Sequence, residues 1–226
     1  MISAPRILGA LLILSISASA APKSHIVTFG KWITISWRSQ RNEFETVSLK
    51  IRPLLVDGRT REFALGNPHE ITEHTFAVQR IYRLNDSLPQ DSGPPRWQWE
   101  RGGWLLVDRA SGKIQQITLP QFDPDLSGVS WYRDYAAYCG ISDNGQKLVA
   151  VIVQLGHRKP LLAKVIEDAS GVARPFAAPH WERDPTRAIF ELGSNQQLMF
   201  SIIRSRTAEL ASQDHTPQDE DDEDSQ

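Results

Sequence analysis

Acidic and hydroxyl side chains between residues 123 and 134 have the spacing of a calcium-binding loop. Asp123, Asp125 and Ser127 stand at alternate positions, and an acid, Asp134, comes eleven positions after Asp123. Oxygen ligands in this order can wrap one Ca²⁺. However, Ser130 stands where such loops carry a hydrophobic residue, and no flanking helices are predicted. Two interpretations stay open: a calcium site formed by Asp123, Asp125, Ser127 and Asp134, or a turn held by Asp and Ser side chains.

Two histidines near residue 70 resemble a zinc site at first. His69 is followed by Glu70, and the second histidine, His74, comes five positions after the first. The zinc-protease motif needs the second histidine at four positions, so that both face one metal from a helix. Asn67-Pro68 also favours a turn or a strand at this point. No metal site is therefore predicted here.

Aromatic and basic residues are concentrated between residues 96 and 104, which contain three Trp and two Arg after a Pro- and Gly-rich linker. In an exported protein, exposed Trp can stack on sugar rings or anchor the surface of a partner. The alternative is that these Trp alternate into the core of a strand pair. The candidate binding residues are Arg96, Trp97, Trp99 and Arg101.

Signatures of covalent catalysis are missing from the sequence. It contains no Gly-x-Ser-x-Gly, no phosphate-binding glycine loop and no Ser-x-x-Lys. The only cysteine, Cys139, lies in an apolar stretch and is predicted to be a small buried side chain. No catalytic residue and no cofactor, calcium apart, are therefore predicted.

The first twenty residues predict export. Arg6 precedes a ten-residue apolar run, Ile7–Ile16, and Ala18-Ser-Ala20 supplies the small residues that signal peptidase accepts. The run is about half as long as a membrane span. We expect residues 1–20 to be a signal peptide removed before Ala21, with an uncleaved anchor as the alternative. The mature chain is then secreted or periplasmic, without membrane insertion.

Alternating apolar residues predict strands along the rest of the chain. One such set is Val27, Phe29, Ile33, Ile35 and Trp37. Two well-marked strands, at 135–141 and 147–155, are joined by the turn Asp143-Asn-Gly145. Strands separated by tight glycine turns predict an antiparallel all-β fold over about residues 25–205.

The chain also resembles itself at a period of about 50 to 60 residues. Gly112 and Gly171, each after Ala-Ser, are each followed eight positions later by proline. Next come Trp131-Tyr-Arg-Asp134 and Trp181-Glu-Arg-Asp184, and each Trp precedes an apolar run by seventeen positions. The order and spacing predict repeated small antiparallel sheets, with Trp131 and Trp181 in equivalent buried places. Residues 121–129 are an insertion in the first copy.

One of these units looks like a blade of the TolB-type β-propellers. The resemblance is best over residues 129–153, with Trp131, Tyr138, Ser142-Asp-Asn-Gly145 and Lys147-Leu148. The segment 107–112 similarly resembles the outer hairpin of such a blade. The resemblance implies propeller-like blades and a binding role, and it carries over no catalytic residue. An open, β-sandwich-like array of sheets is the alternative architecture.

Charge divides the chain into a basic body and an acidic end. The net charge of −2 includes eight acids and no Lys or Arg in residues 209–226. The remaining 19 acids face 24 bases once Arg6 is set aside, so residues 21–208 carry about +5. A segment this acidic is predicted to be a disordered tail. Five net charges over the body are too few to predict binding of nucleic acid.

Export, repeated sheets and the Trp-rich segment together favour one function. We expect a non-catalytic binding or scaffold protein that contacts another protein or a cell-envelope polymer. The alternative is a secreted hydrolase of extracellular glycans or peptides, with carboxylates gathered from distant segments. Sequence spacing identifies no such pair of carboxylates.

Overall fold

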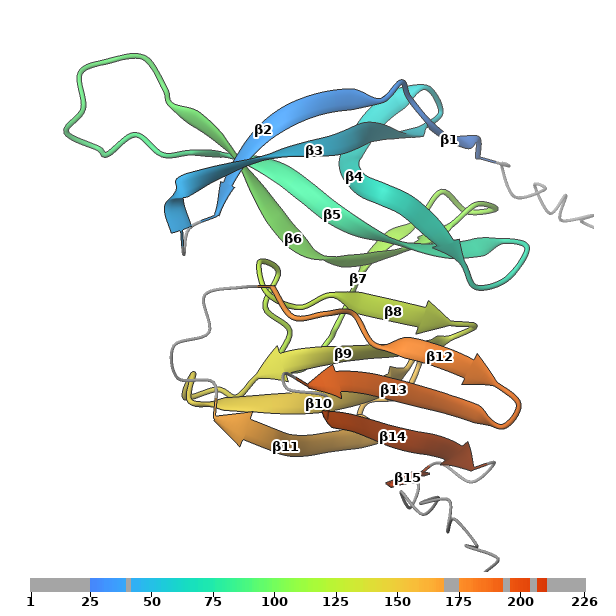
Figure 1. Cartoon of the computed structure of the whole chain (residues 1–226). Helices are drawn as coiled ribbons and strands as arrows, with labels where there is room; N and C mark the ends of the chain where they lie inside the picture. Colours follow the sequence, from blue (N-terminus) through green and yellow to red (C-terminus); the bar gives the residue numbers. More distant parts are fainter. Residues whose placement is uncertain (1–24, 40–41, 169–174, 193–195, 204–206, 211–226) are drawn as a thin grey trace, which may run out of the picture.

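The computed structural model describes residues 25–39, 42–168, 175–192, 196–203 and 207–210, which form fifteen β-strands (Figure 1). No α-helix occurs in these ranges, and thus none that has the length and hydropathy to cross a membrane. The strands make three antiparallel sheets, none of which closes into a barrel. The predicted antiparallel all-β class is confirmed. The predicted signal peptide, residues 1–20, lies outside the described residues.

The first sheet holds seven strands in the order β1-β3-β4-β5-β6-β7, with β2 also paired to β3. The long strand β3 pairs with β2 along its first half and with β1 at its end. The sheet curls, so that β2 approaches β6 (Figure 1). Its strands are β1 (Val27–Phe29), β2 (Ile33–Ser39), β3 (Asn42–Val56), β4 (Arg59–Glu70), β5 (Thr75–Asn85), β6 (Trp97–Asp108) and β7 (Ile114–Ile117).

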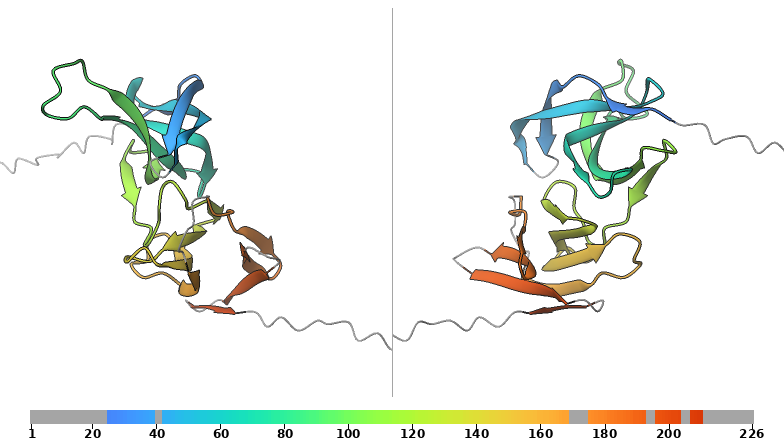
Figure 2. Two further views of the ribbon diagram at one scale, coloured as in Figure 1. Left: turned by 60° about the vertical axis from the view of Figure 1, so that its left-hand side comes forward. Right: turned by 90° about the vertical axis from the view of Figure 1, so that its right-hand side faces the viewer.

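The second and third sheets are four-stranded meanders in which every strand pairs with its neighbours in the sequence. Figure 2 shows the two sheets facing each other beneath the first. The second contains β8 (Val129–Tyr132), β9 (Tyr135–Ile141), β10 (Lys147–Gln154) and β11 (Leu162–Asp168). The third contains β12 (His180–Arg183), β13 (Thr186–Leu192), β14 (Gln196–Ile203) and β15 (Thr207–Leu210).

The last strand, β15, includes the first two residues of the predicted acidic tail, residues 209–226. Glu209 and Leu210 pair with Ser201 and Phe200 of β14, so they belong to the third sheet. The remainder of the predicted tail, residues 211–226, lies outside the described residues, and so do residues 169–171 of the second repeat signature.

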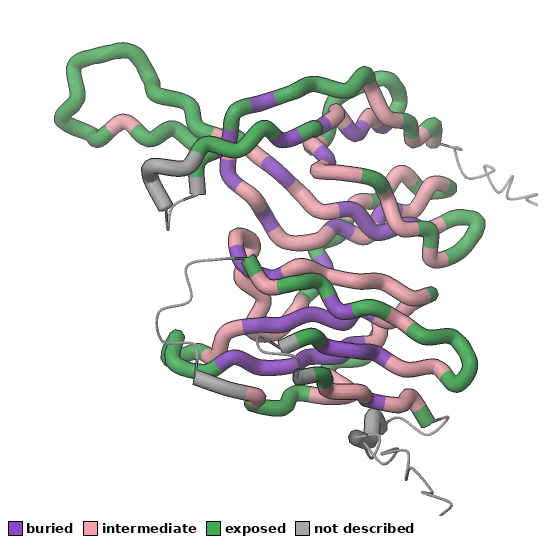
Figure 3. The backbone as a smooth tube through the Cα atoms, in the orientation of Figure 1, coloured by how far each residue is buried: buried purple, intermediate pink, exposed green. Residues whose placement is uncertain are grey.

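The strand β10 is apolar and buried from Leu148 to Val153, and both of its faces are covered over that stretch. Leu148, Ala150 and Ile152 pack with Phe190 and Phe200 of the third sheet. The alternate residues of β10, together with Ala136 and Tyr138 of β9, pack on the opposite face of the second sheet. Cys139 lies in the first of these clusters and is buried, as predicted. Figure 3 shows buried stretches in these two sheets and also along the strands of the curled first sheet.

The two repeat tryptophans both reach toward the sheet that precedes their own. Trp131 of β8 lies 5.3 Å from Trp104 of the first sheet, measured between ring centroids. Trp181 of β12 donates a hydrogen bond of 3.2 Å from Nε1 to the carbonyl of Ser130 in the second sheet. Both side chains are half-buried rather than fully buried. Each therefore contributes to a junction between sheets.

Candidate functional site

The hairpin that joins β5 to β6 projects from the body of the protein as an arm, residues 84–97 (Figure 1). Trp97 stands at its base, paired with Asn85, and is 54% exposed. Leu84 and Leu88 of the same arm are 49% and 56% exposed. The arm thus exposes three large apolar side chains, and the register places Leu84 and Trp97 on opposite faces of the hairpin, since Leu84 pairs with Gln98 and Trp97 with Asn85.

Polar contacts within the arm fix its shape. Arg96 donates hydrogen bonds from Nη2 to the carboxylate of Asp91, at 2.9 Å, and to the carbonyl of Asp86, at 3.3 Å. The backbone N–H of Arg96 donates to Oγ of Ser87, at 2.8 Å, and Gln98 donates to the carboxylate of Asp86. Arg96 was predicted to contact a ligand, but its guanidinium already holds the loop. These contacts hold the arm in the conformation described.

Arg83 brings the two predicted tryptophans together. Its guanidinium carbon lies 5.7 Å from the ring centroid of Trp97 and 5.5 Å from that of Trp99. Trp99 also packs edge-on against Phe63, with the centroids 5.1 Å apart, and is half-buried. The sequence left two interpretations open for these tryptophans, exposed binding residues or core residues. Trp97 is exposed, whereas Trp99 packs against the core.

A hollow of about 250 Å³ lies where β2 and β3 come close to the start of β6. Trp97 and Trp99 of β6 line it together with Trp37 and Arg38 of β2. The full lining is Ser36, Trp37, Arg38, Thr46, Trp97, Gln98 and Trp99. The hollow offers aromatic faces beside a cation, which suits a flat or apolar group with negative charge nearby.

Arg101, the fourth predicted binding residue, is not among the residues that line the smaller hollow. Its guanidinium carbon lies 4.3 Å from the ring centroid of Trp37 inside the curled sheet. Burial lowers the pKa of Arg101, and the negative charge of Asp125 opposes that shift. Arg101 is therefore an interior cation between the first sheet and the loop that follows it.

That loop is the predicted calcium segment, and its side chains form a turn. Oδ1 of Asp123 accepts hydrogen bonds from the backbone N–H groups of Asp125, at 2.9 Å, and Leu126, at 3.1 Å. Oγ of Ser127 accepts from the N–H of Asp123, at 3.0 Å. Asp134 instead accepts the side-chain amide of Gln154, at 2.8 Å. The contacts favour the turn interpretation over the calcium site.

The same loop joins the second and third sheets. Leu126 is 2% exposed, and its carbonyl accepts the N–H of Phe176, at 2.8 Å. A Cβ added at Gly128 would lie 3.1 Å from Ala178, so this backbone passes close to the segment before β12. Within the described ranges, no group of three or more His, Cys, Asp or Glu is placed to hold a metal ion.

Substitutions at Asp123 separate the two interpretations. We expect Asp123→Ala to lower the free energy of unfolding by about 1 to 2 kcal/mol, since two backbone N–H groups lose their acceptor. Asp123→Asn keeps an acceptor oxygen and should cost less than half as much. Denaturant titrations with Ca²⁺ and with a chelator measure both. A calcium site would instead make wild-type stability depend on Ca²⁺ and make both variants insensitive to it.

The histidine pair occupies a strand end and a turn rather than a helix. His69 lies in β4, and His74 precedes β5. Nε2 of His69 donates to the carbonyl of Arg133, at 2.8 Å, and its ring stacks on Trp131, with centroids 5.7 Å apart. His69 therefore joins the first sheet to the second.

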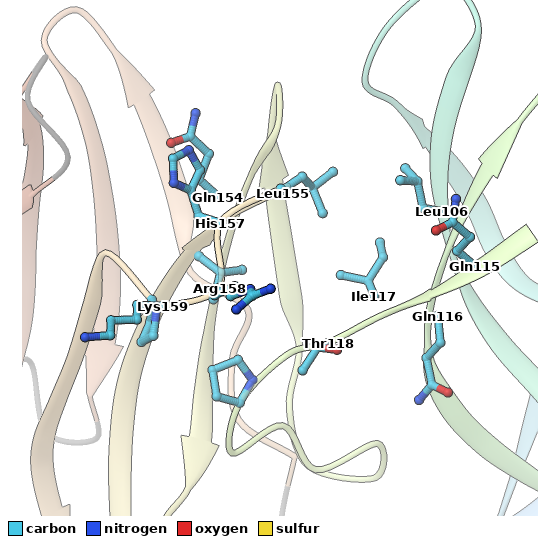
Figure 4. Close-up of a pocket in the computed structure, with 14 residues that line it drawn as sticks. Leu106, Gln115, Gln116, Ile117, Thr118, Gln154, Leu155, His157, Arg158 and Lys159 are labelled. Carbon is cyan, nitrogen blue, oxygen red and sulfur yellow. The ribbon is translucent and has the colours of Figure 1, made fainter.

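A larger hollow, of about 490 Å³, lies between β7 and the turn that joins β10 to β11 (Figure 4). Ile117 of β7 faces Leu155 and Arg158 of the turn across this space. The lining comprises Leu106, Gln115, Gln116, Ile117, Thr118, Pro120, Val153, Gln154, Leu155, Gly156, His157, Arg158, Lys159 and Pro160. Sequence reasoning did not predict it; the nearest signal is the basic turn at 157–159.

The chain matches no protein-family model, no curated protein and no solved structure.

Proposed function

We propose that this chain is an exported, non-catalytic binding or scaffold protein. It contacts another protein or a cell-envelope polymer through the arm and the hollow at the arm's base. The observation that carries the proposal is the environment of Trp97. This side chain is 54% exposed, lies against Arg83 and lines the smaller hollow. Trp and Arg in such settings dominate the energetics of many protein interfaces.

The order within the arm supports a binding role. Loops that become ordered only on binding lose part of the interaction energy to that ordering. Here, the ion pair between Arg96 and Asp91 and the hydrogen bond to Ser87 fix the loop beforehand. Leu84 and Leu88 expose further apolar surface elsewhere on the same arm. Binding to this arm would therefore use a preformed surface.

We also propose that the second and third sheets are propeller-like blades. Each is an antiparallel meander of four strands in sequence order. The first strand of each carries a tryptophan, Trp131 or Trp181, that contacts the preceding sheet. Successive units of this kind are typical of repeat folds, in which each unit covers the apolar face of its neighbour. This arrangement is consistent with the resemblance to TolB-type blades.

The binding proposal predicts a large effect at Trp97. We expect Trp97→Ala to weaken binding of the captured partner at least 30-fold, because hot-spot tryptophans contribute about 2 kcal/mol or more. The melting temperature should stay within about 2 °C of wild type, since the side chain is exposed. Affinity capture from envelope proteins and from isolated envelope polymer identifies the partner, and titration with that purified partner gives the affinities.

Trp32→Ala is the matched control. Trp32 is 46% exposed and lies under the guanidinium of Arg52, 4.4 Å from its ring centroid, so it repeats the local chemistry of Trp97. It precedes the first residue of β2, whereas the hollow contains residues near the end of that strand. Equal losses from both variants would contradict a site at the arm. Turnover of a glycan or peptide without capture of any partner would favour the hydrolase alternative.

A further inference from the structure

The larger hollow lies at a junction of two sheets. The edge strand β7, which pairs only with β6 in the described part of the chain, forms one side. The end of β10 and the turn 155–160 form the other side. Its volume of about 490 Å³ falls in the range of small-molecule sites in proteins, roughly 300 to 1,000 Å³.

Aliphatic side chains make up much of the lining. Ile117 and Val153 are buried, and Leu106 and Leu155 are half-buried. Figure 4 shows Ile117 and Leu155 facing each other across the space, with Leu106 farther to the right, near Gln115. An apolar surface of this kind favours a hydrocarbon or aromatic group over a hydrated ion.

The charged residues of the lining are all basic. They are Arg158 and Lys159, with His157 as a third basic group, and no Asp or Glu lines the space. Figure 4 shows Arg158 directed into the hollow, whereas Lys159 and His157 point away from it. Arg158 makes no hydrogen bond or ion pair with any residue in the described ranges. Its guanidinium is thus available to a ligand at the edge of an apolar surface.

We propose that this hollow binds a small molecule that has an apolar body and a single carboxylate. The body lies against Ile117 and Leu155, and the carboxylate accepts paired hydrogen bonds from Arg158. A planar guanidinium matches the geometry of a carboxylate. One inward-facing cation balances one negative charge, which favours a monoanion over a phosphate dianion. This site is separate from the arm and does not depend on the function proposed for the arm.

Calorimetric titration with decanoate and with its uncharged methyl ester tests the assignment on the whole chain, with its acidic end in place. We expect wild type to bind decanoate at least ten times more tightly than methyl decanoate. Arg158→Gln should weaken decanoate binding about tenfold or more and leave binding of the ester within twofold. Leu155→Ser should weaken binding of both probes, because it removes part of the apolar surface.

Lys159→Gln is the control, since it removes the same charge from the same turn on a side chain that points away. We expect it to change decanoate affinity less than twofold, and Arg158→Lys to keep part of the affinity that Arg158→Gln loses. Three results would overturn the proposal: no binding of decanoate to wild type, equal binding of acid and ester, or equal losses from Arg158→Gln and Lys159→Gln. None of these results bears on capture through Trp97.

Discussion

Gly140→Ala is expected to lower the free energy of unfolding by about 3 kcal/mol, although it adds a single methyl group. Gly140 lies in β9, where a Cβ would stand 2.4 Å from the carbonyl oxygen of Gln121. That contact is with backbone, so no side chain can rotate aside to relieve it. The midpoint of a denaturant titration measures the loss.

The carbonyl of Gln121 has little freedom to retreat. It accepts the N–H of Ile141, at 2.9 Å, and Gln121 itself has a φ of 60°, in the left-handed region. Nearby, the hydroxyl of Tyr138 donates to the carbonyl of Pro120, at 2.6 Å. These two hydrogen bonds hold Pro120 and Gln121 directly against β9. A methyl group inserted at Gly140 must therefore push the backbone of Gln121 away from the strand and strain both hydrogen bonds.

Gly145→Ala provides the control. Gly145 has a φ of 73°, but no atom lies within 4 Å of an added Cβ. Alanine there should cost only about 1 kcal/mol, the penalty for a left-handed backbone. Equal costs at the two positions would show that the approach of Gln121 to β9 does not constrain the fold.

The local features of this fold could be predicted from the sequence because they depend on neighbouring residues. Residues 135–141 and 147–155 alternate or run apolar between turn signals, and they form β9 (Tyr135–Ile141) and β10 (Lys147–Gln154). Cys139 is surrounded by apolar residues in the sequence and is buried in the structure. Periodicity and turn chemistry are sufficient for such predictions.

Features that depend on distant segments could not be predicted in this way. Arg101 has the same parity as Trp97 and Trp99, yet its partner is Trp37, in a strand more than sixty residues earlier. The larger hollow brings β7 against a turn some forty residues later. The spacing of Asp123, Asp125 and Ser127 suited calcium, but the same spacing serves a capped turn, and only the contacts separate the two.

Phe190→Ala is expected to have the largest effect of all, a loss of about 4 kcal/mol in the free energy of unfolding. Phe190 of β13 is fully buried and packs edge-on against Phe200, with the ring centroids 5.6 Å apart. Both rings lie between the second and third sheets, beside Ala150 and Ile152 of β10. Truncation leaves a cavity that the rigid strands on either side cannot close.

The reactivity of the Cys139 thiol reports on opening of the interface that Phe190 fills. It is the only cysteine of the chain, is 3% exposed and belongs to the same cluster as Phe190. A thiol reagent reaches it only when the second and third sheets separate or the protein unfolds. If labelling follows the opening equilibrium, a loss of 4 kcal/mol should speed the reaction of Cys139 about a thousandfold, at 1.4 kcal/mol per factor of ten.

Phe190→Leu distinguishes lost volume from lost aromatic geometry. Leucine fills most of the same space, so we expect a cost of about 1 kcal/mol and less than a tenfold increase in the labelling rate of Cys139. If Phe190→Ala lowers the unfolding midpoint while the labelling rate stays at the wild-type value, the two sheets do not open at the interface that Phe190 fills. Coupled changes in stability and labelling would instead identify this interface as the one through which the third sheet is held to the rest of the protein.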